Sequence, residues 1–340
     1  MITPTDITDI KKKMEVILLK KIIVPVLCML LLLLSACTEN KEEAEAHQKP
    51  VEIQPETVKI ARNSELTIVP LYTPYQKYLK ASLKTDDPEM DKKYYAKYVL
   101  SYIDEIGEQE KFSTADLKGN FMLQSTSYEQ ELLNRIDTLM KQHDKIKEVI
   151  TENYIAAHKI LPKKKSTIFI VPSNSDFPTM SESLAGVTGA AYKDAFVLYL
   201  DQTFDKNVLA YTIAHEYHHL ILHDTPDFKI SSVLKSVIVE GKADAFADRI
   251  VKGVSPPWDV PMDNTTKKHV AGLVNNYETT FNDVTFGNEQ KDIPRWSNYI
   301  LGRDILNHYL KSNPNLSIKE WTYKDEHEIL KDYKYQNILE

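Results

Sequence analysis

Apolar residues recur at helical spacing along two long stretches in the first half of the chain. They lie three or four positions apart over residues 88–111, and again over residues 126–160, where the pattern allows one break. This period is typical of amphipathic helices that bury one face. Residues 58–70 precede both stretches and contain short β-branched runs, which predict one or two short strands.

The pattern changes after residue 165. Two short and nearly continuous apolar runs, residues 166–171 and 194–200, predict buried strands, and we expect the second of them to form an edge of the sheet. The small residues 186–190 between them are typical of a loop or an irregular strand. The rest of the chain returns to the helical period, which predicts helices over residues 205–223, 229–252, 265–283, 295–312 and 317–333.

The order of these elements predicts an α+β fold, because mainly helical regions precede and follow a small sheet. Ser317 and Glu320 have the spacing of a capping box, which marks the start of the last helix. A chain of 340 residues is long enough to bury a large core without disulfides.

The balance of charge argues against one class of function. The chain has 42 Lys and Arg residues against 49 Asp and Glu residues, and a formal net charge of −7. Because no basic excess exists to neutralise phosphates, we do not expect a dedicated nucleic-acid-binding protein. No segment of the sequence matches a glycine-rich phosphate-binding motif either.

The first residues of the chain have the pattern of a targeting signal. Lys20 and Lys21 precede an apolar run over residues 22–34, which leads into Leu-Ser-Ala-Cys at residues 34–37. This order is typical of a secretory signal peptide, and a single signal-anchor helix is the alternative. Leu-Ser-Ala-Cys resembles the bacterial lipobox, which implies that Cys37 becomes the lipidated first residue of the mature protein.

This resemblance also implies a location and a partner. We expect a protein anchored by lipid at the extracytoplasmic face of the bacterial cell membrane, bound to the bilayer through Cys37. The other cysteine, Cys28, lies in the apolar run and is lost with the signal peptide, so the mature chain has no disulfide. Residues 37–57 are charged and contain few large apolar side chains, which predicts a flexible tether.

The residues His215-Glu216-Tyr-His-His219 lie inside the helix predicted for residues 205–223. Positions four apart on a helix differ by about 40° around its axis, so the two outer imidazoles leave the same side of the helix. Imidazoles placed in this way can bind one Zn²⁺. Glu216 projects in a different direction, from which it can act on a metal-bound water as a general base. A partly exposed polar helix face is the alternative.

A catalytic zinc site needs a third ligand, and the next predicted helix can supply it. A metzincin would have Gly at position 222 and His at position 225, but Leu222 and Thr225 stand there. Glu240 lies on the helix predicted for residues 229–252, which a short turn folds back across the first. Two His, one Glu and an open position form a catalytic site and not a closed structural one.

Asp244 lies one helical turn beyond Glu240. From this position it can accept a hydrogen bond from a ligating His and so fix the tautomer of that ring. An ordinary surface pair is the alternative interpretation of the two carboxylates. His223 is a weaker candidate for the third ligand.

The segments HEYHH and VIVEGKADAFA resemble the bacterial predicted zinc-dependent proteases called domain of unknown function 2268, which are gluzincin-like proteins. The resemblance covers roughly residues 160–312. It implies a small mixed sheet packed on the active-site helix. It also implies that His215, His219 and Glu240 bind the metal and that Glu216 is the catalytic base.

Residues 294–302, PRWSNYILG, are similar to that family's downstream P-R-W-x-x-Y-x-x-G helix. The likeness stops there, because Arg303 and Asp304 stand where an aromatic or apolar pair is expected. Tyr299 lies on this helix and can donate a hydrogen bond to a developing oxyanion. A core aromatic residue is the alternative interpretation of Tyr299.

Two functions follow from these residues. The first is a membrane-anchored zinc metallopeptidase that cleaves a peptide or protein substrate, with a zinc amidase acting on cell-wall peptides as a variant. The second is a non-enzymatic zinc-binding lipoprotein that binds peptides or acts as a chaperone-like module, against which the unligated Glu216 argues. The chain then divides into a signal peptide (residues 1–36), a tether (37–57), a mainly helical N-terminal region (58–160) and a catalytic domain (161–340).

Overall fold

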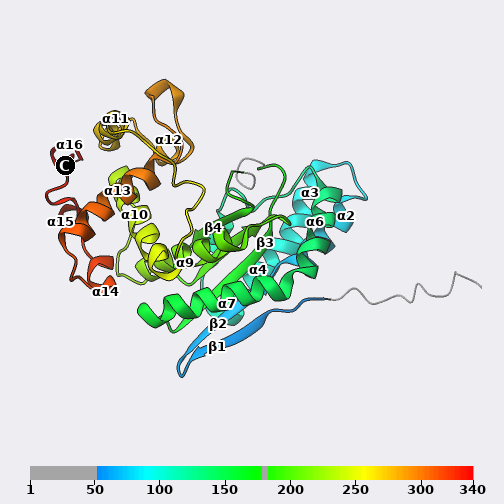
Figure 1. Cartoon of the computed structure of the whole chain (residues 1–340). Helices are drawn as coiled ribbons and strands as arrows, with labels where there is room; N and C mark the ends of the chain where they lie inside the picture. Colours follow the sequence, from blue (N-terminus) through cyan, green and yellow to red (C-terminus); the bar gives the residue numbers. More distant parts are fainter. Residues whose placement is uncertain (1–51, 178–182, 340) are drawn as a thin grey trace, which may run out of the picture. The chain divides into compact units, whose positions relative to one another are not determined.

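The computed structural model describes residues 52–177 and 183–339. The predicted signal peptide, Cys37 and most of the predicted tether lie outside these described residues. The chain from Ile53 onward forms one compact unit, with strands and helices of mixed order (Figure 1). This arrangement confirms the predicted α+β fold. No helix in the described part of the chain is long and apolar enough to cross a membrane.

A five-stranded mixed sheet lies at the centre of the unit, in the order β1-β2-β3-β5-β4. β2 is parallel to β3 and β3 to β5, whereas β1 and β4 run antiparallel to their neighbours. The bounds of the strands are β1 Glu56–Ala61, β2 Ser64–Pro70, β3 Lys165–Pro172, β4 Val187–Ala191 and β5 Ala195–Leu200. The predicted strands are therefore all present, and the small residues near 186–190 also form one.

The edge of the sheet differs from the prediction. β5 lies between β3 and β4, so the strand predicted as an edge is an interior strand. All six residues of β5 are buried, as an interior strand requires. The edge strand beside β5 is β4, in which the small residues 189–191 are only half-buried, and β1 forms the other edge. The apolar run of β5 reflects burial on both faces, which periodicity alone does not distinguish from an edge strand.

Helices in the first half of the unit precede β3. Their bounds are α2 Tyr72–Ser82, α3 Pro88–Tyr95, the π-helix η1 Ala96–Leu100, α4 Ser101–Glu110, α5 Ala115–Lys118, α6 Glu129–Lys141 and α7 His143–Ile160. The helix predicted over residues 88–111 is present, with the π-helical segment within it. The stretch over residues 126–160 forms two helices that meet at Gln142, which is the predicted single break. The sequence pattern did not predict α2.

The second half is helical after β5, as predicted. The bounds are α9 Lys206–Leu222, α10 Val233–Ile250, α11 Asn264–Val274, α12 Phe281–Phe286, the 3-10 helix η2 Glu289–Lys291, α13 Ser297–Ser312, α14 Ile318–Thr322, α15 Glu326–Leu330 and α16 Gln336–Leu339. Two long helices were wrongly predicted here. The segment 265–283 breaks after Val274 because Thr280 caps a new helix, and the segment 317–333 breaks because Asp325 does the same. The capping box of Ser317 and Glu320 is confirmed.

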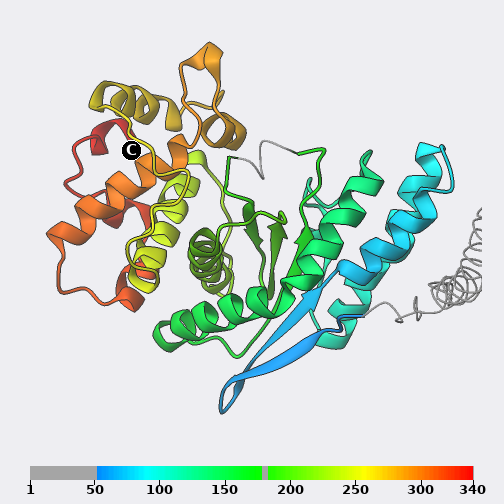
Figure 2. The same cartoon turned by 45° about the vertical axis from the view of Figure 1, so that its right-hand side comes forward.

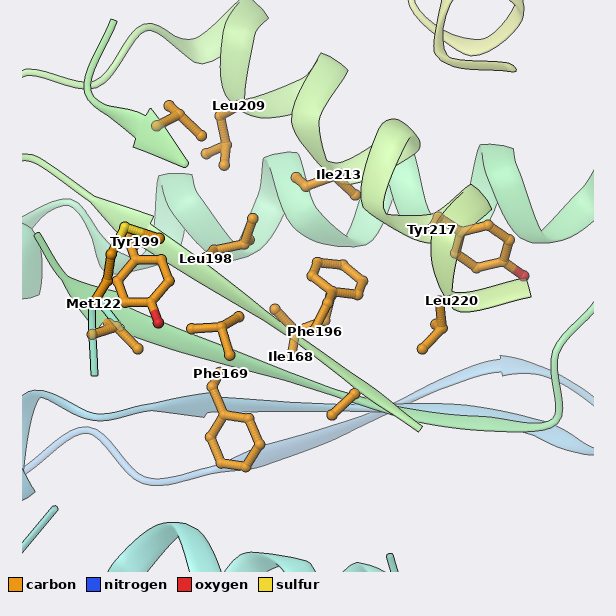
Figure 3. Packing of buried hydrophobic residues seen from close by; sticks show 14 of the residues in the cluster. Met122, Ile168, Phe169, Phe196, Leu198, Tyr199, Leu209, Ile213, Tyr217 and Leu220 are labelled. Atoms are coloured by element: carbon orange, nitrogen blue, oxygen red, sulfur yellow. The ribbon is translucent and has the colours of Figure 1, made fainter. Parts of the chain in front are cut away.

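α9 connects the sheet with the C-terminal helices. It lies between the sheet on one side and α10 and α13 on the other (Figure 2). Its residues Ile213 and Leu220 lie over Phe196 of β5, whereas Phe169 of β3 points to the opposite face of the sheet (Figure 3). Asp205 fixes the start of α9, because its carboxylate accepts hydrogen bonds from two backbone amides of the first turn.

α10 and α13 cross in direct backbone contact. A Cβ atom at Gly241 would overlap the backbone of Gly302, and a Cβ atom at Gly302 would overlap the carbonyl oxygen of Val237. Only glycine at both positions permits this approach. The crossing holds Tyr299 and Arg303 of α13 at fixed positions beside α10.

Candidate metal centre

Two imidazoles of α9 converge at the surface that this helix turns toward α10. His215 is buried, and its Nε2 atom lies 3.0 Å from Nε2 of His219. The two rings are 4.7 Å apart between centroids and nearly perpendicular to one another. Their spacing of four residues places them on one side of the helix, as the sequence predicts.

Glu240 of α10 completes the cluster. Its Oε2 atom lies 3.1 Å from Nε2 of His215 and 3.4 Å from Nε2 of His219. A tetrahedral ion with ligand bonds of 2.0–2.1 Å separates its ligand atoms by roughly 3.3 Å, which is close to the separations of this cluster. Within the described residues these three side chains form the one group of His, Cys, Asp and Glu with metal-binding spacing.

The electrostatics of the cluster favour a cation. Burial by itself would lower the pKa of His215, but hydrogen bonds to Asp244 and Glu240 outweigh it and raise this pKa to about 10. Burial would likewise raise the pKa of Glu240, yet the charge of His219 and the hydrogen bonds of both imidazoles lower it to about 2. The carboxylates therefore hold positive charge at the ligand atoms. The donor set and its spacing fit Zn²⁺ with three protein ligands.

Asp244 orients the first imidazole. It is fully buried, and its Oδ1 atom lies 3.0 Å from Nδ1 of His215. In the neutral ring that binds a metal, an N–H on Nδ1 that donates to this carboxylate leaves Nε2 with a lone pair directed at the cluster. Trp258 donates from Nε1 to the same carboxylate over 3.2 Å, and the Tyr211 hydroxyl donates over 3.2 Å.

Arg303 closes this network from α13. Its guanidinium binds Asp248 at 2.7 Å, donates to the Tyr211 hydroxyl at 2.7 Å and lies 3.5 Å from Asp244. The departure from the family pattern after Gly302 thus places a cation beside two buried or half-buried carboxylates of α10. Its neighbour Asp304 faces Lys267 instead, over 2.8 Å.

Glu216 is buried beside the cluster and is not part of it. Its carboxyl group lies against Gly189 of the edge strand, where any Cβ atom would overlap it, and it is hydrogen-bonded to the backbone of Ala191. Burial raises the pKa of Glu216. Such a carboxyl group, held between a helix and a strand in the cavity that His215 lines, can accept and return a proton.

Tyr299 of α13 also lines this cavity. Its ring centroid is 6.0 Å from that of His215, and it contacts both Trp258 and Trp296. Burial, with the nearby charges of Glu240 and Glu216, raises the pKa of its phenol well above the usual value. Tyr299 therefore stays protonated and can donate a hydrogen bond.

The other histidines in and directly after α9 lie elsewhere. His218 is fully buried, stacks on Trp321 and lies 3.3 Å from the Thr322 hydroxyl. His223 packs edge-on against Phe228 and does not join the cluster. The structure thus brings together the two predicted imidazoles with Glu240, and not with His223.

Sequence reasoning missed several residues of this centre. Trp258 and Tyr211 carry no motif, because their roles come from a loop and a helix that meet only in the fold. Gly189 is one small residue among several, and only its contact with Glu216 shows why it must be small. A signal existed for Arg303, since an arginine that follows a buried helical turn needs an acidic partner.

Comparison with known proteins agrees with the geometry. The model of a family described as "Predicted Zn-dependent protease (DUF2268)" matches residues 146–331. This span is more than half of the 340 residues, begins within α7 and includes α9, α10 and α13. No curated protein matches the chain at a significant level.

Proposed function

We propose that this chain, which belongs to the family of predicted Zn-dependent proteases (DUF2268), is a zinc metallopeptidase that hydrolyses peptide bonds. One observation carries the proposal: the Glu216 carboxyl group lies in the cavity beside the His215, His219 and Glu240 cluster without belonging to it. A structural metal site has no use for a buried carboxyl group next to its ligands, whereas hydrolysis needs a base there.

Each residue has a separate task in this proposal. Zinc, held by the three clustered side chains, would supply a Lewis acid that polarises a peptide carbonyl and lowers the pKa of water. Glu216 takes a proton from the attacking water on its carboxylate and passes it to the nitrogen of the leaving amine. Asp244 holds the His215 ring through Nδ1, and the protonated Tyr299 donates to the oxygen that gains charge.

The edge strand offers a place for the substrate backbone. Among the described strands, β4 pairs with β5 alone, and its residues 187–190 line the cavity that contains Glu216. An extended peptide can add to such an edge through main-chain hydrogen bonds. This pairing would hold the peptide beside Glu216 along β4, and not along β5 as the sequence pattern suggested.

The proposal is tested by Glu216→Gln, which keeps the size of the side chain and removes the proton acceptor. We expect zinc content and thermal stability to stay near those of the wild type, and hydrolysis of a diverse peptide library to fall by about 10²–10⁴-fold. His219→Ala is the matched change in the ligand set and should lose zinc. If the wild type binds zinc and cleaves no peptide in the library, the non-enzymatic peptide-binding function replaces this one.

We further propose that Cys37 carries a lipid that holds the protein at the extracytoplasmic face of a bacterial membrane. The support is the order of basic residues, apolar run and Leu-Ser-Ala-Cys in the sequence. Mass spectrometry of the membrane fraction should find a lipid-modified N-terminal peptide that begins at Cys37. A free thiol at Cys37, or recovery of residues 22–34 in the mature protein, would contradict it.

A further inference from the structure

The cavity beside the metal cluster has the size of one bulky side chain. Its volume is about 160 Å³, and it is lined by His215, Glu216 and Tyr299 on the side of the cluster. An apolar cavity of about 150 Å³ in a protein is large enough to hold a benzene ring. The volume therefore matches a phenylalanine or leucine side chain next to the reacting peptide bond.

The rest of the wall is mainly apolar. The side chains that form it include Met122, Leu184, Val187, Trp258 and Trp296, each of them at least nine-tenths buried. Neither Lys nor Arg is among the described residues that line the cavity. An acidic substrate side chain would lose its hydration there, find no Lys or Arg partner in the wall and face the carboxyl group of Glu216.

A cluster of partly exposed aromatic rings adjoins this cavity through Phe121. Phe121, which also lines the cavity, is 53% exposed, and Phe286 is 40% exposed. The ring of Phe121 contacts those of Phe286 and Phe177 edge-on, at centroid distances of 6.4 and 5.5 Å. Three separate segments thus contribute to one aromatic patch, and patches of this kind next to a cavity mark binding surfaces.

Part of this wall lies outside the span that matches the family. Phe121 and Met122 precede residue 146, where the match begins, and they follow α5 in the helical N-terminal region. The side chain of Asn120 holds their turn, because its Oδ1 accepts the amide of Met122 and its Nδ2 donates to Tyr192. The N-terminal region therefore reaches the cavity that the matched region forms around Glu216.

We infer that this cavity selects a peptide substrate by one bulky apolar side chain, of phenylalanine or leucine size, and that the turn at residues 120–122 sets this preference. The inference rests on the proposed peptidase function and names its substrate class. The occupant is an extended peptide, because Glu216 and residues 187–190 of the edge strand β4 line the same cavity.

The first experiment maps cleavage by the zinc-loaded wild type in a library of glycine-rich peptides in which one position varies. We expect cuts beside Phe, Leu or Met to be at least about 10-fold faster than cuts beside Gly or Asp, as hydrophobic pockets discriminate. Phe121→Ala, at an exposed position, should raise KM for the Phe peptides and leave zinc content unchanged. Tyr277→Ala is the matched control, because Tyr277 is 93% exposed and does not line the cavity.

A second variant, Met122→Lys, places a cation in the wall with a side chain of similar length. It should shift the preference toward peptides with Asp at the varied position. Phe121→Ala keeps the inference testable if Met122→Lys does not fold. Cleavage without any preference for apolar residues, or a Phe121→Ala protein that behaves as Tyr277→Ala does, would overturn the inference and leave the peptidase function intact.

A binding measurement separates the two proposals. Glu216→Gln is titrated with fluorescein-labelled glycine-rich peptides that contain either one Phe or one Asp, and fluorescence anisotropy gives both dissociation constants. In one outcome the wild type cleaves no peptide, yet the Phe peptide binds at least about 10-fold more tightly than the Asp peptide. The peptidase function then fails and the apolar site stands. Equal binding of the two peptides, or no binding of either, rejects the apolar site.

Discussion

The two sides of α9 are both buried, but they depend on different physics. Toward the sheet, Ile213 and Leu220 contact Phe196 and its neighbours through many weak apolar contacts (Figure 3). Toward α10, His215 and His219 depend on a few polar atoms with fixed directions. The comparison indicates that stability and chemistry can be changed separately on one helix, because apolar burial requires no particular direction of contact and metal ligation does.

The largest effect on stability is expected on the sheet side. Leu220→Ala removes a fully buried side chain and leaves a cavity, which should lower the free energy of unfolding by about 2–5 kcal/mol. Denaturant titration measures this change, and zinc content per folded molecule should not move. Leu83→Ala is the control, because Leu83 is 48% exposed and its truncation should cost less than about 0.5 kcal/mol. Loss of zinc at unchanged stability would show that the two sides are not separable.

A change on the strand that faces the cluster should affect activity and not stability. Gly189→Ala places a Cβ atom where the Glu216 carboxyl group lies, so this group must move. A displacement of about 1 Å can cost about 100-fold in rate, and we expect kcat to fall by that order while zinc stays bound. Gly272→Ala is the matched control, since its Cβ atom meets only Ile338, at 3.8 Å. A Gly189→Ala protein with wild-type kcat would contradict the catalytic position assigned to Glu216.

The same contrast explains which features could be predicted from the sequence. Spacing of four residues on a helix is a local property, so the approach of His215 and His219 follows from the motif alone. The position of Glu240 beside the two imidazoles could be predicted because a short turn between α9 and α10 makes α10 fold back on α9. The fold class followed similarly from the order of apolar runs.

Features that depend on distant partners were not predictable. The edge position of β4 is decided by the pairing of β3 with β5, and periodicity contains no information on this pairing. The wall formed by Phe121 and Met122 requires that a turn in the N-terminal region reach α9, which no local pattern encodes.

The breaks within residues 265–283 and 317–333 were missed because capping by Thr280 and Asp325 outweighed a helical apolar period.

A smaller effect is expected for the residue that orients the metal ligand. Asp244→Asn keeps the shape of the side chain but removes the charge that favours an N–H on Nδ1 of His215. We expect zinc affinity and kcat/KM to fall together by roughly 10–100-fold. Competition with a chelator of known affinity measures the first and library hydrolysis the second.

Arg303→Lys sharpens this result, because the guanidinium contacts Asp244 only at 3.5 Å and acts mainly on Asp248 and Tyr211. It should weaken zinc binding less than Asp244→Asn does. If Arg303→Lys loses zinc more completely than Asp244→Asn does, then Asp244 is not the residue whose charge orients His215.

The smallest effect concerns a histidine far from the cluster. His143 begins α7 and lies edge-on to Tyr72, and burial lowers its pKa below the usual value near 6.5. The unfolded chain therefore binds a proton in a range of pH where the folded protein does not. Stability is complete above about pH 6.5 and falls as the pH drops toward the lowered pKa, by at most about 1.4 kcal/mol per pH unit. The Gln side chain does not titrate. The stability of His143→Gln relative to the wild type should therefore rise as the pH falls from 7.5 to 5.5. Urea unfolding of both proteins at these two pH values measures the difference, and a difference that does not change with pH would mean that folding does not lower the pKa of His143.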